Sequence, residues 1–195
     1  DLYRPYRPKR RTRATIAKEK GLEPLAEILR AQATTRTIEE EATAFVDAEK
    51  GVESVQDAID GAKDILAEVY ADDADYRTKL RAMTKESGSL VAKAKDEEAD
   101  SVYEMYYDFS EPIKKLVGHR ILAINRGEAE KFLTVKIEAP RQEILLWLVK
   151  QIIGNMKHDS ASYLYEAITD SYDRLIAPSI EREICFLYTS PSPRA

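Results

Sequence analysis

Signals for the start of a helix recur along this chain, and they constrain its fold more than any other feature of the sequence. Thr37-Ile38-Glu39-Glu40 is a capping box, in which a threonine and a glutamate three residues later bond the first free amides of a helix. Ser54 opens a similar segment, Asp72 or Asp73 precedes another, and Ser160 precedes a long stretch with helical apolar spacing. The chain is therefore predicted to be a series of capped helices.

The composition agrees with this prediction. Only 7 of the 195 residues are glycine, and the charged fraction is 33%, which suits many solvated helix surfaces. Helices are expected over residues 13–20, from 23 onward, and over 37–48, 54–70, 72–86, 96–107, 110–126, 140–153, 160–176 and 179–184. Gly127 is expected to stop the helix before it, and Pro178 to mark a bend.

Two segments are typical of strands. Ser89–Ala94 alternates weakly, and Phe132–Glu138 is rich in β-branched residues and alternates more clearly. They could pair as a ribbon. The predicted fold class is therefore mostly α, a multi-helical array with helical hairpins and at most a small two-stranded β-ribbon.

The first 20 residues form a basic head on an acidic body. They carry a net charge of +6, whereas the whole chain carries −5, so the remaining residues sum to −11. Pro5 and Pro8 favour an extended loop, Thr12 is a plausible N-cap for the first helix, and Gly21 joins that helix to the next as a hairpin. The candidate nucleic-acid-binding residues are Arg7, Lys9, Arg10, Arg11, Arg13, Lys18 and Lys20.

This head has two possible roles. Its cations could contact phosphates, with Tyr3 and Tyr6 stacking on unpaired bases. They could instead dock on acids of the same chain, for example around Glu39-Glu40-Glu41 or Asp72-Asp73. The two roles differ in whether the arginines are free or already paired.

Signs of catalytic or metal chemistry are weak. A single cysteine, Cys185, allows neither a disulfide within the chain nor a thiolate cage, and fits a reducing compartment. The histidines are His119 and His158. Although His158-Asp159-Ser160 contains the letters of a catalytic triad, adjacent residues cannot take triad geometry. We expect no enzyme activity, no metal, no cofactor and no membrane span, and a cytoplasmic location.

The chain is expected to divide into three parts. Residues 1–36 form the basic loop with the helical hairpin, residues 37–184 form the helical body, and residues 185–195 are expected to be a non-native tail. That tail changes composition abruptly and ends in Thr-Ser-Pro-Ser-Pro-Arg-Ala, which resembles translated sequencing-adaptor readthrough. A genuine Pro/Ser-rich linker is the alternative.

The stretch Tyr3–Ala26, which includes Tyr-Arg-Pro-Tyr-Arg-Pro-Lys-Arg-Arg-Thr-Arg, resembles the signature of the Tex family of RNA-binding transcription accessory proteins. Four later segments agree in order: Ala58–Ile65, Tyr107–Lys114, His119–Gly127 and Asp170–Glu183. The resemblance covers Leu2–Ile184. It implies a helical region that precedes an RNase-H-like domain, helix-hairpin-helix motifs and an S1 domain.

The resemblance implies a nucleic-acid-associated scaffold in transcription, with the basic head as an auxiliary phosphate contact. The family is taken to bind RNA or DNA mainly through the S1 domain, which lies outside this chain. The transcription machinery is a further possible partner. The alternative is a purely structural helical scaffold, or a protein-interaction module, without direct nucleic-acid contact.

Overall fold

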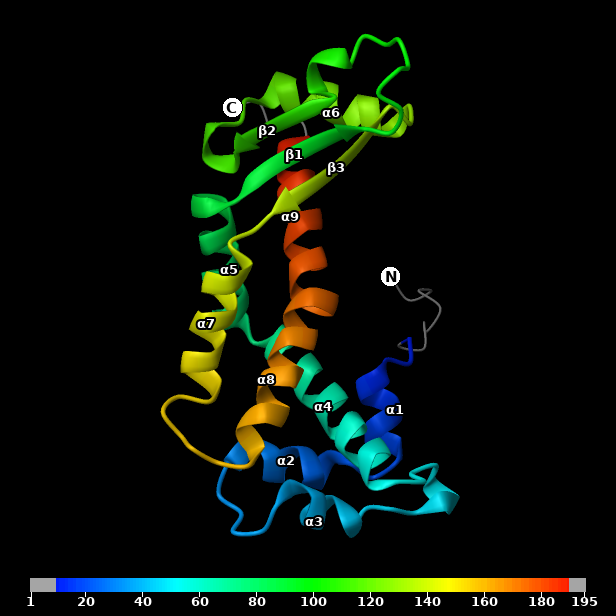
Figure 1. The fold of residues 1–195 in the computed structure, drawn as a ribbon, viewed down its shortest axis with the longest axis vertical. Coiled ribbons are helices and arrows are strands. Elements are labelled where there is room, and N and C mark those ends of the chain that lie inside the picture. Colours follow the sequence, from blue (N-terminus) through cyan, green and yellow to red (C-terminus); the bar gives the residue numbers. More distant parts are fainter. Residues whose placement is uncertain (1–9, 190–195) are drawn as a thin grey trace, which may run out of the picture. The chain divides into compact units, whose positions relative to one another are not determined.

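The computed structural model describes residues 10–189, with side chains to residue 186, and divides into two compact units. Unit 1 comprises Asp1–Asp72 and Leu148–Tyr172, and unit 2 comprises Asp73–Trp147 and Asp173–Ala195. Helices dominate, which confirms the mostly α class (Figure 1). Among the described residues, no helix is long and apolar enough to cross a membrane.

Unit 1 is wholly helical apart from its connectors. Its elements are α1 (Arg13–Glu19), α2 (Glu23–Ala31), α3 (Ile38–Thr43), the short 3-10 turn η1 (Ala48–Lys50), α4 (Val55–Asp72), the last turn of α7 (Arg141–Ile152), and α8 (Ser160–Asp170). The third helix is shorter than the predicted 37–48. Thr37 nevertheless caps it as expected, accepting a hydrogen bond from the amide of Glu40 at 3.1 Å.

Helix α4 forms the centre of unit 1, because α1, α2, α3 and α8 all pack against it. One face of α4 is apolar, and its residues Ile59, Ala62, Ile65 and Leu66 are all buried. Together with the leucines of α2 they exclude water from the core of the unit, which is the main source of its stability.

The α1–α2 hairpin depends on a glycine in α4. Gly21 turns the chain with a φ of +79°, as the sequence predicts. Gly61 was not singled out by the sequence, yet a Cβ placed there would lie 2.2 Å from the Leu22 Cδ1 atom and 3.4 Å from the Ala17 Cβ atom. The absence of a side chain at Gly61 therefore lets the hairpin approach α4 closely.

Unit 2 contains α5 (Ala74–Ser87), β1 (Ser89–Ala94), η2 (Glu104–Tyr106), β2 (Asp108–Pro112), η3 (Ile113–Lys115), α6 (Gly118–Ala129), β3 (Leu133–Glu138), most of α7, and α9 (Ala177–Thr189). The predicted pairing of Ser89–Ala94 with the Phe132–Glu138 segment is confirmed as an antiparallel pair, with Ala92 opposite Val135. The sheet has one strand more than expected, in the order β2-β1-β3.

The extra strand replaces a predicted helix start. Ser110-Glu111-Pro112 was expected to open a helix, but these residues end β2, and Phe109 lies opposite Ala92 of β1. Proline is compatible with this place because an edge strand can lack one donor. A local start signal was thus overridden by pairing with a strand about 20 residues earlier.

The helix predicted over Asp96–Tyr107 is wrong. The segment consists of turns and the short η2, so Glu97 and Glu98 do not start a helix. The Tyr107 hydroxyl donates to the carbonyl of Ala99 at 2.6 Å and lies 2.8 Å from the Ser101 hydroxyl. These side-chain bonds hold the backbone in a compact loop and compete with helix formation.

The prediction that Gly127 stops a helix is also wrong, because Gly127 lies inside α6 and is buried. A Cβ there would lie 2.6 Å from Leu133 and 3.1 Å from Tyr103. Its role is therefore to let α6 approach the sheet, whose core cluster contains Leu90, Ala92, Tyr103, Ile124 and Leu133.

The chain continues as helix beyond residue 170. A π-helical segment, Ser171–Ile176, precedes α9, and the expected stop at Ile184 is not observed because α9 reaches Thr189. Pro178 stands near the start of α9 and has no amide hydrogen to donate to the carbonyl of Arg174. In a regular α-helix its ring would also clash with that carbonyl, and the wider π-helical turn before it relieves the clash. Residues 190–195 of the predicted tail lie outside the described residues.

An arginine pair holds α5 to α9 within unit 2. Arg81 donates to both carboxylate oxygens of Glu183, at 2.6 and 3.2 Å. Arg77 reaches the same carboxylate at 3.4 Å and the Ser179 hydroxyl at 2.7 Å. The hydrogen bond from Arg81 outweighs partial burial and lowers the pKa of Glu183, with further help from the charges of Arg81, Arg77 and Lys85.

We predict that Gly61→Ala destabilises unit 1 by about 1–2 kcal/mol. The gain in helix propensity, about 1 kcal/mol, is outweighed by the overlap of the new methyl group with buried Leu22. Urea unfolding would measure the change. Gly118→Ala is the control, since a Cβ at Gly118 meets nothing within 4 Å; equal effects at both glycines would contradict the close approach.

We predict that Glu183→Gln removes part of the acid sensitivity of unit 2. Because the folded pKa of Glu183 is lowered, its contribution is present above the unfolded value of about 4.3 and is lost as the pH falls through that value toward the folded pKa. Unfolding free energies measured from about pH 7 to about pH 3 would show a shallower loss in the variant. Glu86→Gln, at an exposed carboxylate bonded to Lys114, is the matched control.

Candidate nucleic-acid interface

The structure places five of the seven predicted binding residues around α1. Arg10 and Arg11 precede the helix, Arg13 is its first residue, Lys18 lies in its last turn, and Lys20 is its C-cap. Arg7 and Lys9 lie outside the described residues. The short helix therefore arranges the cations of the head that can be described.

The entry into α1 is fixed by side-chain bonds to acids. Thr12 caps the helix as predicted, accepting from the Thr15 amide at 3.1 Å, and its hydroxyl donates to the Glu68 carboxylate of α4 at 2.8 Å. The Arg11 guanidinium is paired with Glu19. Among residues 10–20 of the head, Thr12 therefore meets Glu68 of α4, whereas Arg11 pairs with Glu19 of the head itself. The described part of the head makes no bond to Glu39-Glu40-Glu41 or Asp72-Asp73.

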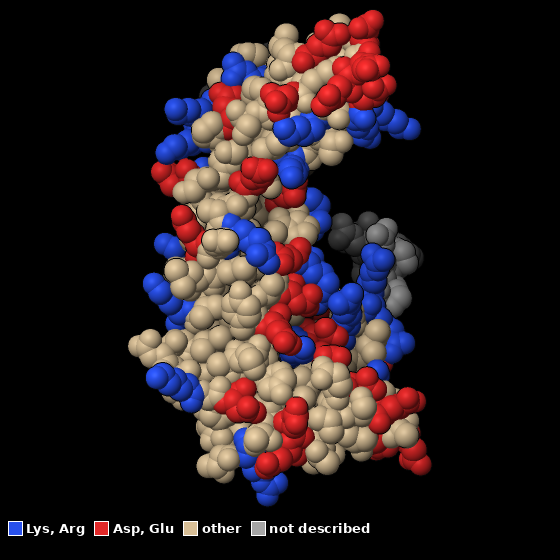
Figure 2. Space-filling model, viewed as in Figure 1, with Lys and Arg blue, Asp and Glu red and all other residues tan. Residues whose placement is uncertain are grey.

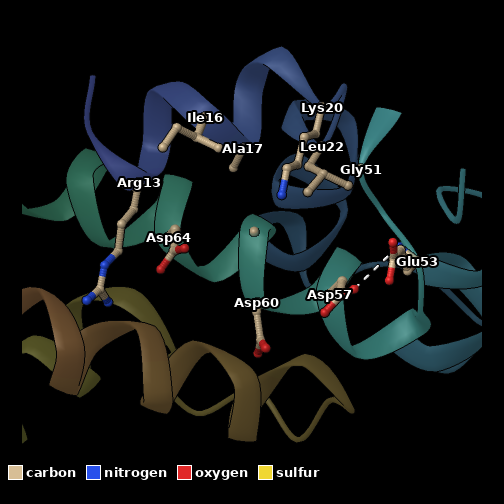
Figure 3. Close-up of a pocket in the computed structure, with 11 residues that line it drawn as sticks. Arg13, Ile16, Ala17, Lys20, Leu22, Gly51, Glu53, Asp57, Asp60 and Asp64 are labelled. Carbon is tan, nitrogen blue, oxygen red and sulfur yellow. Dashed lines mark hydrogen bonds between the residues drawn. The ribbon is translucent and has the colours of Figure 1, made fainter. Parts of the chain in front are cut away.

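A groove of about 320 Å³ lies between α1 and α4, with Gly61 among its lining residues (Figure 3). Ile16, Ala17 and Leu22 give it an apolar side. From α4, three carboxylates at helical spacing project along it (Asp57, Asp60 and Asp64), and Glu53 lies at one end. The Asp57 carboxylate accepts from the Glu53 amide at 3.3 Å, which holds that end in place.

A second hollow of about 300 Å³ adjoins the first, since both are lined by Arg13, Asp60 and Asp64. The second hollow is also lined by Glu166 and Asp170 of α8 and by Lys63 of α4. Figure 2 shows acidic and basic side chains gathered beside one another over this part of unit 1.

Acids outnumber bases in the combined groove. Six carboxylates and three cations line it, and the cations are Arg13, Lys20 and Lys63. Lys63 is ion-paired with both neighbouring acids, since its Nζ atom lies 2.5 Å from a carboxylate oxygen of Glu166 and 3.4 Å from one of Asp60. Burial alone would lower the pKa of Lys63, but the hydrogen bond and charge of Glu166, with those of Asp60, raise it above its ordinary value.

The head is therefore divided into two groups of cations. Arg11 is paired, and Arg13 and Lys20 line a groove whose negative potential disfavours phosphate. Arg10 and Lys18 are exposed, and neither makes an ion pair with another residue of the described part of the chain. These two remain the cations best placed to contact a polyanion.

The sequence contains a local signal for this groove. Asp57, Asp60 and Asp64 are spaced by three and four residues, which places them on one face of a helix. The partner face could not be identified from the sequence, because it depends on where the α1–α2 hairpin packs. Within residues 10–189, no group of three His, Cys, Asp or Glu side chains could hold a metal ion.

The fold and the groove define a mostly helical module that seats a basic segment against acidic helices. Residues 33–185 match the family model described as Tex central region-like. The chain therefore belongs to the Tex family, as the resemblance indicated.

Similar proteins support the assignment to the Tex family. "Uncharacterized protein YdcI" of Bacillus subtilis is 46% identical over 187 residues, which cover 94% of this chain and 26% of that protein. "Protein tex" of Bordetella pertussis is 40% identical over 139 residues, which cover 70% of this chain and 17% of that protein. The human "S1 RNA-binding domain-containing protein 1" is 31% identical over 159 residues, which cover 74% of this chain and 16% of that protein. The chain thus spans about a quarter or less of the length of these relatives.

We predict that Arg13→Glu destabilises unit 1 more than Arg10→Glu. The two variants change the net charge equally, but only Arg13 faces the carboxylates of the groove, where a seventh acid would be repelled. Thermal unfolding at low ionic strength would show the difference, and salt would reduce it. Equal effects at both positions would mean that the groove does not hold Arg13 electrostatically.

Proposed function

We propose that this chain is the scaffold region of a nucleic-acid-associated protein that acts in transcription. Two relatives support the context: one from Neisseria gonorrhoeae is named "Transcriptional accessory protein Tex", and the human relative is named for an S1 RNA-binding domain. The region would position neighbouring domains and carry out no reaction of its own.

The observation that carries the scaffold role is the acidic groove. Six carboxylates receive the side of α1 that bears Arg13 and Lys20, so part of the basic head serves to attach α1 to α4. Thr12 adds a direct bond to Glu68. A surface designed to hold phosphate would not be lined by an excess of carboxylates, because they repel it.

A second candidate function is auxiliary phosphate contact by Arg10 and Lys18. It is favoured by their exposure and by the absence of ion-pair partners for them among the described residues. Lys and Arg at a surface supply the sequence-independent, salt-dependent part of nucleic-acid binding. Such contact would add to the binding by domains outside this chain and would not replace it.

The test separates these two functions. The chain would be titrated into fluorescently labelled single-stranded RNA and duplex DNA over a series of salt concentrations, with anisotropy as the readout. The charge-reversal variant is Arg10→Glu with Lys18→Glu. Its matched control is Arg30→Glu with Lys157→Glu, which makes the same change of net charge at other exposed sites of unit 1.

For the scaffold role alone, we expect weak binding that both double variants reduce equally. For auxiliary phosphate contact, the Arg10/Lys18 variant loses affinity and the control does not. The slope of log affinity against log salt would then fall by roughly 1.4–1.8, the value expected for two lost phosphate contacts. Strong binding that neither variant changes would contradict both assignments of the head.

A further inference from the structure

The connector between β1 and β2, residues 95–107, exposes large apolar side chains more fully than any other described segment. Val102 is 80% exposed and Met105 is 72% exposed, the two highest values among the large apolar residues that the structure describes. Scattered apolar residues are ordinary at a protein surface, but these two stand only three residues apart. Both therefore belong to one small area of unit 2, which we call the 95–107 loop.

The fold turns these two side chains outward by burying their neighbours. Tyr103 is only 5% exposed, and its ring packs on that of Phe132 with the ring centroids 5.9 Å apart. The ring of Tyr106 packs edge-on against Phe109, with 5.4 Å between the centroids. Because these tyrosines face the core of unit 2, the residues directly before them face solvent.

Hydrogen bonds hold the loop in this conformation. The Tyr103 amide donates to the Ser101 hydroxyl at 3.1 Å, and the Ala99 amide donates to the carbonyl of Asp96 at 3.1 Å. The Tyr107 hydroxyl adds its bond to the carbonyl of Ala99. A surface that is ordered before it binds loses less conformational entropy on association. The exposed pair is therefore presented ready for a partner.

The 95–107 loop is strongly acidic. Its sequence contains one base, Lys95, and five acids, so its net charge is 1 − 5 = −4. None of these acids makes an ion pair with another residue of the part that the structure describes. Figure 2 shows acidic side chains gathered where Figure 1 places this loop. The acids, all exposed, are Asp96, Glu97, Glu98, Asp100 and Glu104.

These charges determine which kind of partner fits. Carboxylates without neighbouring cations repel phosphate, so RNA and DNA are disfavoured. Protein interfaces commonly have an apolar centre, in which methionine is frequent, and a polar rim. Here Val102 and Met105 are the centre, and the rim is negative. The partner must therefore present an apolar strip with Lys or Arg beside it, and a basic amphipathic helix has this pattern.

We propose that the 95–107 loop is a docking site for a basic amphipathic helix of a partner protein. Val102 and Met105 pack on the apolar stripe of that helix, and the acids of the loop pair with the Lys and Arg side chains that border the stripe. The inference goes beyond the scaffold role, because it assigns a protein partner to unit 2 and does not depend on whether the basic head contacts nucleic acid.

Methyl nuclear magnetic resonance on the whole chain tests the proposal. Because the chain has 3 methionines, labelled methyl groups give separate signals for Met83, Met105 and Met156. The probe is a leucine–lysine peptide of about 18 residues, long enough to form a helix, with the leucines on one face. A peptide of the same composition in scrambled order is the control for charge alone.

We expect the helical peptide to shift the Met105 signal at a lower concentration than the scrambled peptide does. Met156 is the internal control, since it is 52% exposed in the connector between α7 and α8, and its signal should stay in place. Single-stranded RNA, added in a separate titration, should leave the Met105 signal unchanged.

Two double variants of the chain locate the contact. Val102→Ser with Met105→Ser should weaken binding of the helical peptide about tenfold or more, because two apolar side chains lose their burial. Val46→Ser with Met156→Ser removes the same residue types from exposed positions of unit 1, and should leave the affinity unchanged. Since all four side chains are exposed, neither variant removes a core contact. Anisotropy of the labelled peptide measures the affinity.

Four results would each overturn the inference. They are equal affinity of the helical and scrambled peptides, equal effects of the two double variants, a Met105 signal that neither peptide changes, and a Met105 signal that RNA shifts. The first would mean that charge alone attracts the peptide, and the last would mean that nucleic acid is the occupant.

Discussion

The close approach of the α1–α2 hairpin to α4 is the contact on which unit 1 depends. It is possible because Gly61 presents no side chain to Leu22 and Ala17. Buried leucines of α2 then pack on the apolar face of α4, and burial of this surface provides the favourable free energy. The same approach creates the groove, because it brings one side of α1 over the row of aspartates on α4.

The groove shows that part of the basic head has contacts within its own unit. A run of arginines at a chain's beginning suggests a polyanion partner, but Arg11 and Arg13 lie beside carboxylates of the same unit. Exposed ion pairs contribute little stability individually, at about 0–1 kcal/mol. The Arg11–Glu19 pair lies within the α1 segment, so α1 is oriented on α4 by the Thr12–Glu68 bond and by the place of Arg13 in the groove, and Arg10 and Lys18 face solvent. Attachment, and the phosphate contact that we propose for Arg10 and Lys18, therefore involve different cations of one segment.

The helical part of the fold could be predicted where the signals are local. Thr12 and Thr37 each cap the helix that the sequence assigned to them, and Asp73, one of two candidates, caps α5. The two predicted strands pair as expected. The predicted ends of the third and the last helix are wrong. The larger errors fall between residues 96 and 127, where Pro112 and Gly127 suggest a helix start and a helix stop. Their true roles, ending an edge strand and allowing a close approach to Leu133, depend on partners distant in the sequence.

The sequence by itself determined the helical class, the caps, the family resemblance and the position of the basic head, because each rests on residue types within a few positions of one another. Only the tertiary structure decided which acids meet the head and why Gly61 is needed. These features join segments separated by tens of residues. Local spacing contains no record of such contacts, since they are chosen by how the helices pack.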